Sequence, residues 1–394
     1  MKSYQIYQKQ LFQQIQKEVT SAISKAIEVA YFDTPRHYFV DKLLDHNAAK
    51  EIIEVTITAE NLPNYLPQLY GNHPLGLATD EKGVVISTIS QPSAVLSMLQ
   101  KLDIQEGQRV LEIGTASGWN AALLSKLVGT IGEVHSVEII ANLARRAKSK
   151  MAKYQLPNVY LYDGDGAIQT YRQSFDRIMF TVGAYDIPVI IFQQLKEDGL
   201  LLMVLKTRGL MDSMILLKKQ RNHLVAMDLA PGRFVPLKGK YAMSQLDALN
   251  LENLPLWGKI KDKKVYQQSF WWGNKSTNPR TKLVKLVGIT SFLGIIEPNF
   301  YLFENDEKEL SFGLVEKEAE SIVIWKNNQL MAYGNKSAFA TIKAAFRLYF
   351  DLGMPSANCF QLKVYPIHEI ITPQEREWLV KRKDAQFLWF LKNE

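Results

Sequence analysis

The chain has 394 residues, of which 47% are hydrophobic and 22% charged. This length favours two folded units, since one domain usually takes roughly 100 to 200 residues, and the apolar fraction can supply a core to each. The formal charge of +7 is scattered, so it gives weak support for a nucleic-acid partner and fits an acidic peptide equally well. Cys359 is the only cysteine, which excludes an internal disulfide and a multi-cysteine metal site and favours a reducing cytoplasm.

The N-terminal region predicts a helical cap over about residues 1–80. Apolar residues recur at helical spacing from Lys9 to about Val29, which predicts one helix that ends before the Thr34-Pro35 step. The first residues lack the apolar core of a secretion signal, and nowhere do about 18 apolar residues run together. Export and a membrane span are therefore not expected.

From about residue 86 to 229, short apolar runs alternate with helical patterns. This alternation predicts an α/β fold with a parallel sheet covered on both faces, in a first domain that ends near residue 240. The run "SMILLKKQRNHLVAMDLAPGRFVPL" can supply a hairpin. The predicted strands of the sheet are "RVLEIG", "EVHSVEI", "NVYLYDGD", "FDRIMFTV" and "LLLMVLK".

Residues 241–394 predict a second, smaller α/β domain. Strands are expected around Ser311–Val323 and Cys359–Tyr365, with an amphipathic helix near Ser337–Leu352. The aromatic stretch "YQQSFWWGNK" suits either a core or a peptide groove, and a core is the more usual role for such residues.

The stretch "VLEIGTASGWNAALL" carries the strongest chemical signal. A buried strand ends at Glu112, and Gly114 and Gly118 bracket a tight turn, so a ligand can approach the backbone closely. About 20 residues later the next strand ends at Glu138, whose carboxylate can accept hydrogen bonds from two ribose hydroxyls. The third strand is followed by Asp165, which can meet an adenine amino group. These strand ends predict one nucleotide-binding crevice.

Two cofactors compete for this crevice. A dinucleotide requires G-x-G-x-x-G, which the turn does not match, whereas the S-adenosylmethionine pattern E/D-x-G-x-G-x-G fits with a single departure. That departure is Ala116 in place of the middle glycine. Its methyl group is compatible with the turn if φ is negative, although it narrows the approach to the methionine moiety.

The chain resembles the protein L-isoaspartate (D-aspartate) O-methyltransferases over about residues 27–240. The segments "TPRHYFV", "HPLGLATDEKGVVISTISQP", "GDG", "FDRIMFTVGAYDIP" and "FVPLKG" follow in that family's order. The resemblance implies a Rossmann-like class I methyltransferase with S-adenosylmethionine as cofactor and Ser90 as the active-site serine. The cofactor-binding positions that sequence and resemblance together single out are Ser87, Thr88, Ile89, Ser90, Glu112, Gly114, Thr115, Ala116, Gly118, Glu138, Asp165 and Gly166.

The extension beyond about residue 245 is similar to that of methyltransferases that act in ribosomal-peptide maturation of the lanthipeptide or ATP-grasp type. The likeness lies in "SFLGIIEP", "FGLVEKEAESIVIWKNNQLMAYG" and "LGMPSANCFQLKVYP". This likeness implies that residues 241–394 recognise a peptide, which could be a modified precursor. The function predicted is methylation of an aspartate or isoaspartate side chain, leading to a succinimide. The alternatives are a general isoaspartate repair enzyme, a tRNA base methyltransferase and a non-catalytic cofactor-binding adaptor. No basic stripe or stacking platform supports the tRNA alternative.

Ser90 precedes Gln91-Pro92, where a helix is expected to begin. A carboxylate is ionised at neutral pH, so methyl transfer to it needs alignment and no general base, and a serine hydroxyl can supply that alignment. Ser90 could instead cap the helix, although Pro92 would then stand two residues after the cap. Arg36 could attract an acidic substrate near the crevice, but a structural salt bridge is the expected role. No metal site is expected because no ligand cluster is evident.

Overall fold

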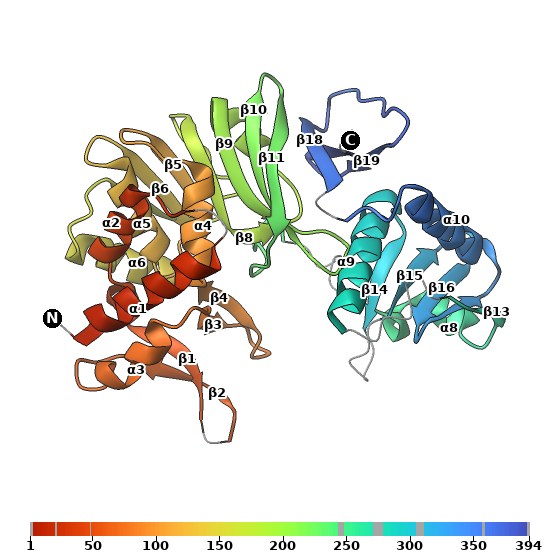
Figure 1. Cartoon of the computed structure of the whole chain (residues 1–394), viewed down its shortest axis with the longest axis horizontal. Coiled ribbons are helices and arrows are strands. Elements are labelled where there is room, and N and C mark those ends of the chain that lie inside the picture. Colours follow the sequence, from red (N-terminus) through yellow and green to blue (C-terminus); the bar gives the residue numbers. More distant parts are fainter. Residues whose placement is uncertain are drawn as a thin grey trace. The chain divides into compact units, whose positions relative to one another are not determined.

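The computed structural model describes residues 3–19, 22–47, 49–242, 248–270, 279–304, 311–356 and 359–391. They form two compact units, which are described separately (Figure 1). Unit 1 comprises Met1–Val204, Ile215–Asn222 and Phe234–Ala242, and unit 2 comprises Leu205–Met214, His223–Arg233 and Met243–Glu394. Unit 1 thus ends close to the expected boundary near residue 240, but two earlier segments belong to unit 2.

A sheet with parallel central strands forms the middle of unit 1. Its strands follow the order β10-β9-β8-β5-β6-β7, and the pairs β5–β6, β5–β8 and β6–β7 are parallel. Because β6 and β8 flank β5 on opposite sides, the strand order switches beside β5, where open α/β sheets bind ligands. The strands are β5 (Arg109–Ile113), β6 (Glu133–Glu138), β7 (Val159–Asp163), β8 (Phe175–Ala184), β9 (Leu195–Leu205) and β10 (Ser213–Gln220). The strands expected in this region are confirmed.

Helices pack against this sheet and bury its apolar side chains. Helix α5 contacts β5, β6 and β7, and α6 contacts β6 and β7. In α6, Leu143, Ala147 and Met151 are buried at four-residue spacing, which places them on one helical face. The helices of this part are α4 (Pro92–Leu102), α5 (Trp119–Val128), α6 (Ala141–Lys153) and α7 (Val189–Gln194).

The N-terminal cap is not wholly helical, and its first helix is interrupted. Ser24 caps a second helix by accepting the Ile27 N–H at 3.4 Å, so the single helix expected from Lys9 to Val29 is wrong. Two antiparallel hairpins, β1–β2 and β3–β4, accompany the helices. The cap elements are α1 (Ser3–Glu18), α2 (Lys25–Asp33), η1 (Arg36–Phe39), β1 (Lys42–His46), β2 (Ile52–Thr56), α3 (Leu62–Leu69), β3 (Leu75–Thr79) and β4 (Val85–Ile89).

Unit 2 contains a sheet of order β12-β14-β15-β16-β17-β13 and a group of order β19-β20-β18-β11. Helix α10 packs on β15, β16 and β17, which confirms the amphipathic helix and the strands expected there. Its elements are β11 (His223–Pro231), β12 (Leu249–Asn250), η2 (Leu251–Asn253), α8 (Pro255–Ile260), β13 (Lys264–Ser269), α9 (Pro279–Ile296), β14 (Phe300–Glu304), β15 (Ser311–Glu316), β16 (Ser321–Lys326), β17 (Gln329–Tyr333), α10 (Ser337–Asp351), β18 (Phe360–Pro366), β19 (Glu377–Lys381) and β20 (Ala385–Leu391).

Part of the aromatic stretch "YQQSFWWGNK" lies outside the described residues, from 271 onward. Of the part that is described, Tyr266 is 36% exposed and packs edge-on against Phe339, while Phe270 stacks on Phe346. Among the helices of the described ranges, none has the length and hydropathy needed to cross a bilayer.

Candidate active site

The turn between β5 and α5 passes three times through the left-handed region of backbone space. The φ angles are +102° at Gly114, +48° at Ala116 and +86° at Gly118. A Cβ atom at Gly114 would lie 2.5 Å from Thr181 Oγ1, and one at Gly118 would lie 2.6 Å from Met151 Cε. Glycine is therefore required at both positions, for its conformation and for the lack of space.

The backbone conformation of Ala116 differs from the prediction, in which its methyl group is compatible with the turn only if φ is negative. The observed φ of +48° shows that this prediction is wrong, and the left-handed conformation costs an L residue roughly 1–2 kcal/mol. The Ala116 N–H donates to Glu138 Oε2 at 2.7 Å, and this charge-assisted hydrogen bond helps to hold the turn. The turn thus keeps the backbone shape that a glycine would adopt.

Glu138 is the last residue of β6, and its side chain is almost completely buried. Its Oε1 accepts the Ile140 N–H at 2.8 Å, while Oε2 accepts the Ala116 N–H. Burial raises the pKa of the Glu138 carboxyl above its usual value, although the backbone donors act in the opposite direction. Each carboxylate oxygen has two lone pairs, so both oxygens can still accept a hydrogen bond from a ligand hydroxyl.

Glu112 lies behind the turn and is fully buried. Its Oε1 accepts a hydrogen bond from Asn120 Nδ2 at 2.7 Å, and its Oε2 accepts one from Ser136 Oγ at 2.5 Å. Burial raises the pKa of Glu112 to about 7, against the lowering effect of these two hydrogen bonds. The Ser136 hydroxyl also contacts Thr115 Oγ1 at 2.6 Å. Glu112 thus holds Asn120 and Ser136 in place.

The loop after β7 brings Asp165 to the same edge of the sheet. Its Oδ1 accepts the Ala167 N–H at 3.0 Å, and its Oδ2 accepts the Lys240 N–H at 2.7 Å. A Cβ atom at Gly166 would lie 3.1 Å from Ile113 Cγ2, which is tighter than ordinary packing. Asp165 therefore ties this loop to the segment around Lys240 while it lines the crevice.

The segment Ser87–Ser90 comes from β4 and the turn that follows it. Ser87 and Ile89 are buried, and Ser90 is half-buried. Helix α4 begins at Pro92 with Gln91 as its N-cap, and the Gln91 side chain makes no capping hydrogen bond. Ser90 is therefore not a helix cap, which leaves its hydroxyl free of the structural role that competed with catalysis.

These segments line one pocket of unit 1, which is open to solvent and has an empty volume of about 850 Å³. Among the described residues, Glu112 and Gly118 do not line the pocket, whereas the other ten predicted positions do. The lining consists of Ile86–Ser90, Val95, Met98, Ile113–Ser117, Trp119, Asn120, Val137–Ile140, Gly164–Gly166, Met179, Thr181, Val182 and Phe234–Lys238.

Sequence reasoning missed two parts of this site. Asn120 lines the pocket, and the only signal for it was its place one residue into the helix after the turn. The sequence shows the segment Phe234–Lys238 only as the motif "FVPLKG", which does not indicate that it forms a wall of the pocket. The Gly183 N–H donates to the Val235 carbonyl and the Leu237 N–H to the Gly183 carbonyl, each at 2.8 Å, so the end of β8 holds this wall.

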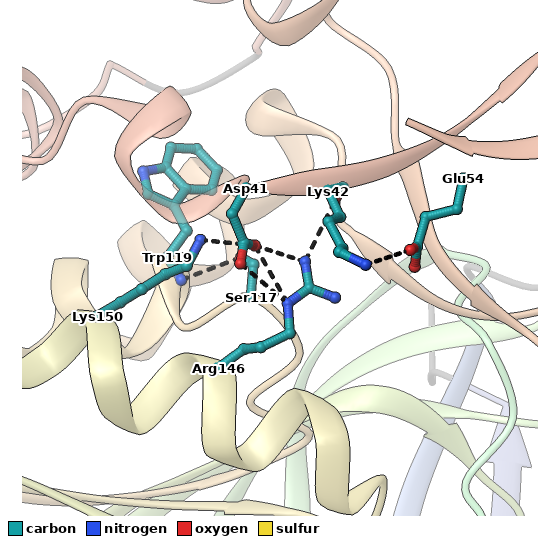
Figure 2. A network of polar contacts seen from close by, with 7 residues as sticks. All are labelled: Asp41, Lys42, Glu54, Ser117, Trp119, Arg146 and Lys150. Carbon is teal, nitrogen blue, oxygen red and sulfur yellow. Dashed lines mark hydrogen bonds and ion pairs between the residues drawn. The ribbon is translucent and has the colours of Figure 1, made fainter. Parts of the chain in front are cut away.

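The cap is fastened to α6 by an ion-pair network that lies behind the turn (Figure 2). Asp41 receives hydrogen bonds from Arg146 Nε at 3.2 Å and from Lys150 Nζ at 3.0 Å. Burial acts to raise the pKa of Asp41, but Arg146 and Lys150 outweigh it and lower that pKa to about 2. Ala116 and Ser117 line a small cavity together with these three residues, so the network adjoins the turn.

An adenosine with a methionine tail suits the chemistry of this pocket. Glu138 and Asp165 supply acceptors from the ends of two successive strands, the turn gives close access to the backbone, and apolar side chains form the remaining walls. A buried carboxylate beside the turn also favours a cationic ligand. Fold and pocket together define a class I S-adenosylmethionine-dependent methyltransferase.

The chain belongs to the protein-L-isoaspartate (D-aspartate) O-methyltransferase family, whose family model matches residues 6–242. It is therefore a carboxyl methyltransferase that uses S-adenosylmethionine. A protein-L-isoaspartate O-methyltransferase of Methanocella arvoryzae is 36% identical over 177 residues, which cover 44% of this chain and 89% of the relative. A second relative of this name, from Archaeoglobus fulgidus, is 32% identical over 225 residues, covering 55% of this chain and 99% of the relative.

The fold likeness extends past the family match. A solved structure named protein-L-isoaspartate O-methyltransferase aligns with 90% of this chain and 96% of its own chain, with a TM-score of 0.53 and 22% identity. At this identity the likeness concerns the fold alone.

Proposed function

We propose that the protein methylates the free α-carboxylate of an isoaspartyl residue in a peptide or protein, and that the ester then closes to a succinimide. The single observation that carries this proposal is the position of Ser90 on the wall of the cofactor pocket, directly after a strand whose residues line the same pocket. The names of the curated relatives support an isoaspartyl substrate.

The chemistry requires alignment more than activation. When bound, S-adenosylmethionine supplies a methyl group on a sulfonium. The substrate carboxylate would take up this methyl group, and the electron pair of the methyl–sulfur bond would stay on sulfur. The Ser90 hydroxyl donates a hydrogen bond to the carboxylate and fixes its direction without adding a positive charge that would weaken the nucleophile. Ring closure follows when the next backbone amide nitrogen attacks the ester, loses its proton and expels methanol.

The direct test uses the purified protein with two peptides that differ only in an aspartyl or an isoaspartyl linkage. The expected result is a methyl ester of the isoaspartyl peptide, followed by a product lighter than the starting peptide by one water. Mass spectrometry distinguishes these species. If the protein binds S-adenosylmethionine but methylates neither peptide, the proposed substrate is wrong.

The role of Ser90 is tested by Ser90→Ala. The variant should bind S-adenosylmethionine as the wild type does and lose roughly ten- to a thousandfold in turnover, because the carboxylate is no longer held in line with the methyl group. Ser90→Thr keeps the hydroxyl but stiffens χ1, so partial activity would support the hydrogen bond. Full activity of a folded Ser90→Ala protein would remove Ser90 from the reaction.

A narrower role in ribosomal-peptide maturation is our second proposal. In that role the substrate is a specific aspartate in a ring-constrained precursor peptide, which unit 2 recognises. Residues 243–394 lie beyond the family match, so the family does not account for them. Strand β13 is an edge strand of its sheet, and Val265 on it is 42% exposed, so an extended peptide could pair there.

Repair and maturation make opposite predictions for substrate choice. A repair enzyme should turn over short linear isoaspartyl peptides of unrelated sequence and should ignore aspartate. A maturation enzyme should prefer aspartate in a cyclised peptide over the same residue in the linear form. Equal rates on all linear isoaspartyl peptides, without turnover of cyclised aspartyl peptides, would exclude maturation. The single cysteine supports placing either activity in a reducing cytoplasm.

A further inference from the structure

Arg36 is 1% exposed and donates hydrogen bonds to five backbone carbonyls. It follows α2 and forms part of the short helix η1. Its Nη1 donates to carbonyls within residues 69–71. Its Nη2 donates to the carbonyl of residue 73 and to those of residues 89–90. The partners are Leu69 O at 2.9 Å and Gly71 O at 3.3 Å for Nη1, and His73 O at 3.3 Å, Ile89 O at 3.2 Å and Ser90 O at 2.9 Å for Nη2.

This guanidinium has no carboxylate partner among the described residues, so the salt bridge expected for Arg36 is wrong. Burial lowers the pKa of Arg36 to about 9, against the opposing effect of Tyr31 and Tyr70. The guanidinium also lies over the Trp119 ring, with its carbon 5.4 Å from the ring centroid. Because burying a cation without a counter-ion is costly, a hydrophobic side chain would serve simple packing better.

We infer that Arg36 is a positioning residue that fixes Ser90 by clamping the β4–α4 turn to residues 69–73. This inference rests on the proposed role of Ser90. The turn lacks a side-chain cap of its own, since Gln91 makes none. Its ties to residues 69–73 are the Arg36 bonds and a bond from the Ser93 N–H to Asn72 Oδ1 at 3.0 Å.

The planar guanidinium explains why an arginine stands here. Its two terminal nitrogens point in fixed directions, so one side chain can hold the carbonyl of Leu69 and that of Ser90 together. A lysine ammonium keeps the charge but donates from a single nitrogen on a flexible stem. Arg36→Lys therefore separates the effect of geometry from that of charge, and Arg36→Met removes both.

The test measures kcat, the KM for an isoaspartyl peptide and the Kd for S-adenosylhomocysteine. Arg36→Lys should lower kcat about ten- to a hundredfold, because small misplacements of an aligned group cost that much. The Kd should change less than kcat, because Arg36 donates to the Ile89 and Ser90 carbonyls but, among the described residues, makes no hydrogen bond to the turn Gly114–Gly118. The matched control is Arg177→Met, because Arg177 donates to the Leu102 and Asp103 carbonyls at the other end of α4. It should lower thermal stability and leave kcat unchanged.

A double-mutant cycle distinguishes positioning from a general structural effect. If Arg36 acts through Ser90, Arg36→Lys should change kcat by less than about threefold in a Ser90→Ala background, since the two effects then share one cause. The inference would be overturned if the loss of kcat in the double variant equals the product of the two single losses. Full activity of Arg36→Lys would also overturn it. A wild-type protein inactive on every carboxyl substrate would instead refute the proposed function. If neither Arg36 variant folds, Asn72→Ala takes their place in the cycle with Ser90→Ala. A loss of kcat in the double variant that is smaller than the product of the two single losses supports the clamp, and a loss equal to that product refutes it.

Discussion

The carboxylate of Glu138 accepts the N–H of Ala116 at 2.7 Å, and this bond links the end of β6 to the cofactor turn. The same carboxylate is predicted to hold the ribose, so it serves the turn and the ligand together. Each of the two residues can be changed separately.

Glu138→Ala should weaken S-adenosylmethionine binding by about 1.5 to 3 kcal/mol, the usual contribution of hydrogen bonds to a charged group. Isothermal titration calorimetry measures the change. The matched control is Glu133→Ala at the other end of β6, where the carboxylate pairs with Arg109. If the wild type, Glu138→Ala and Glu133→Ala bind S-adenosylmethionine with equal affinity, Glu138 does not bind the cofactor.

Ala116→Gly should raise the free energy of unfolding by about 1 kcal/mol. Glycine adopts the observed φ of +48° without the penalty of an L residue, although it gains entropy in the unfolded chain. The smaller residue also widens the turn, so cofactor affinity should stay equal or increase. Thermal denaturation checks the first effect and calorimetry the second. A lower melting temperature for the variant would show that the alanine methyl contributes more by packing than its backbone costs.

Glu112 should make stability depend on pH in the near-neutral range. Burial raises its pKa from 4.5 to about 7, so between these values the folded protein binds more protons at this site than the unfolded chain. Unfolding free energy should therefore decrease as pH rises through this window, by at most about 1.4 kcal/mol per pH unit. Glu112→Gln should flatten the slope in denaturant titrations. An unchanged slope in the variant would assign it to other groups.

Asp41→Asn should destabilise the attachment of the cap to α6. The pKa of Asp41 is lowered to about 2, so its contribution is present above the unfolded value of 3.8 and is lost as pH falls through about 2. Because the side chain is 46% exposed, solvent screening limits the expected loss to about 1 kcal/mol. The control is Glu54→Gln, which breaks the exposed pair with Lys42 shown in Figure 2 and should cost less. Thermal melts between pH 3 and 7 compare the two, and equal losses would contradict the prediction.

Much of unit 1 could be predicted from sequence because its signals are local. Buried strands such as β5 appear as apolar runs, and the turn after β5 shows in the spacing of Gly114 and Gly118. The hairpin β1–β2 gave no such signal, since four of the five residues of β2 are exposed and no apolar alternation marks it. The break between α1 and α2 was missed because Ser24 caps a helix within an otherwise continuous apolar pattern.

The parts of the site that escaped prediction depend on contacts between distant residues. Arg36 finds its carbonyl partners up to 54 residues away, so the motif around it could not show that they are carbonyls instead of a carboxylate. The N–H of Ala116 finds its partner in Glu138, 22 residues later. Sequence spacing identifies which strand ends carry polar groups, whereas the partner of each group is decided only when the segments pack.

The wall Phe234–Lys238 has a consequence for the order in which the site can form during synthesis. It is the last part of the pocket along the chain, and it follows the segment His223–Arg233, which belongs to unit 2. A nascent chain on the ribosome therefore lacks a complete pocket until this segment has emerged, although β5, its turn and β6 have been available long before. Until then, cofactor binding cannot contribute its full stabilisation to the growing chain.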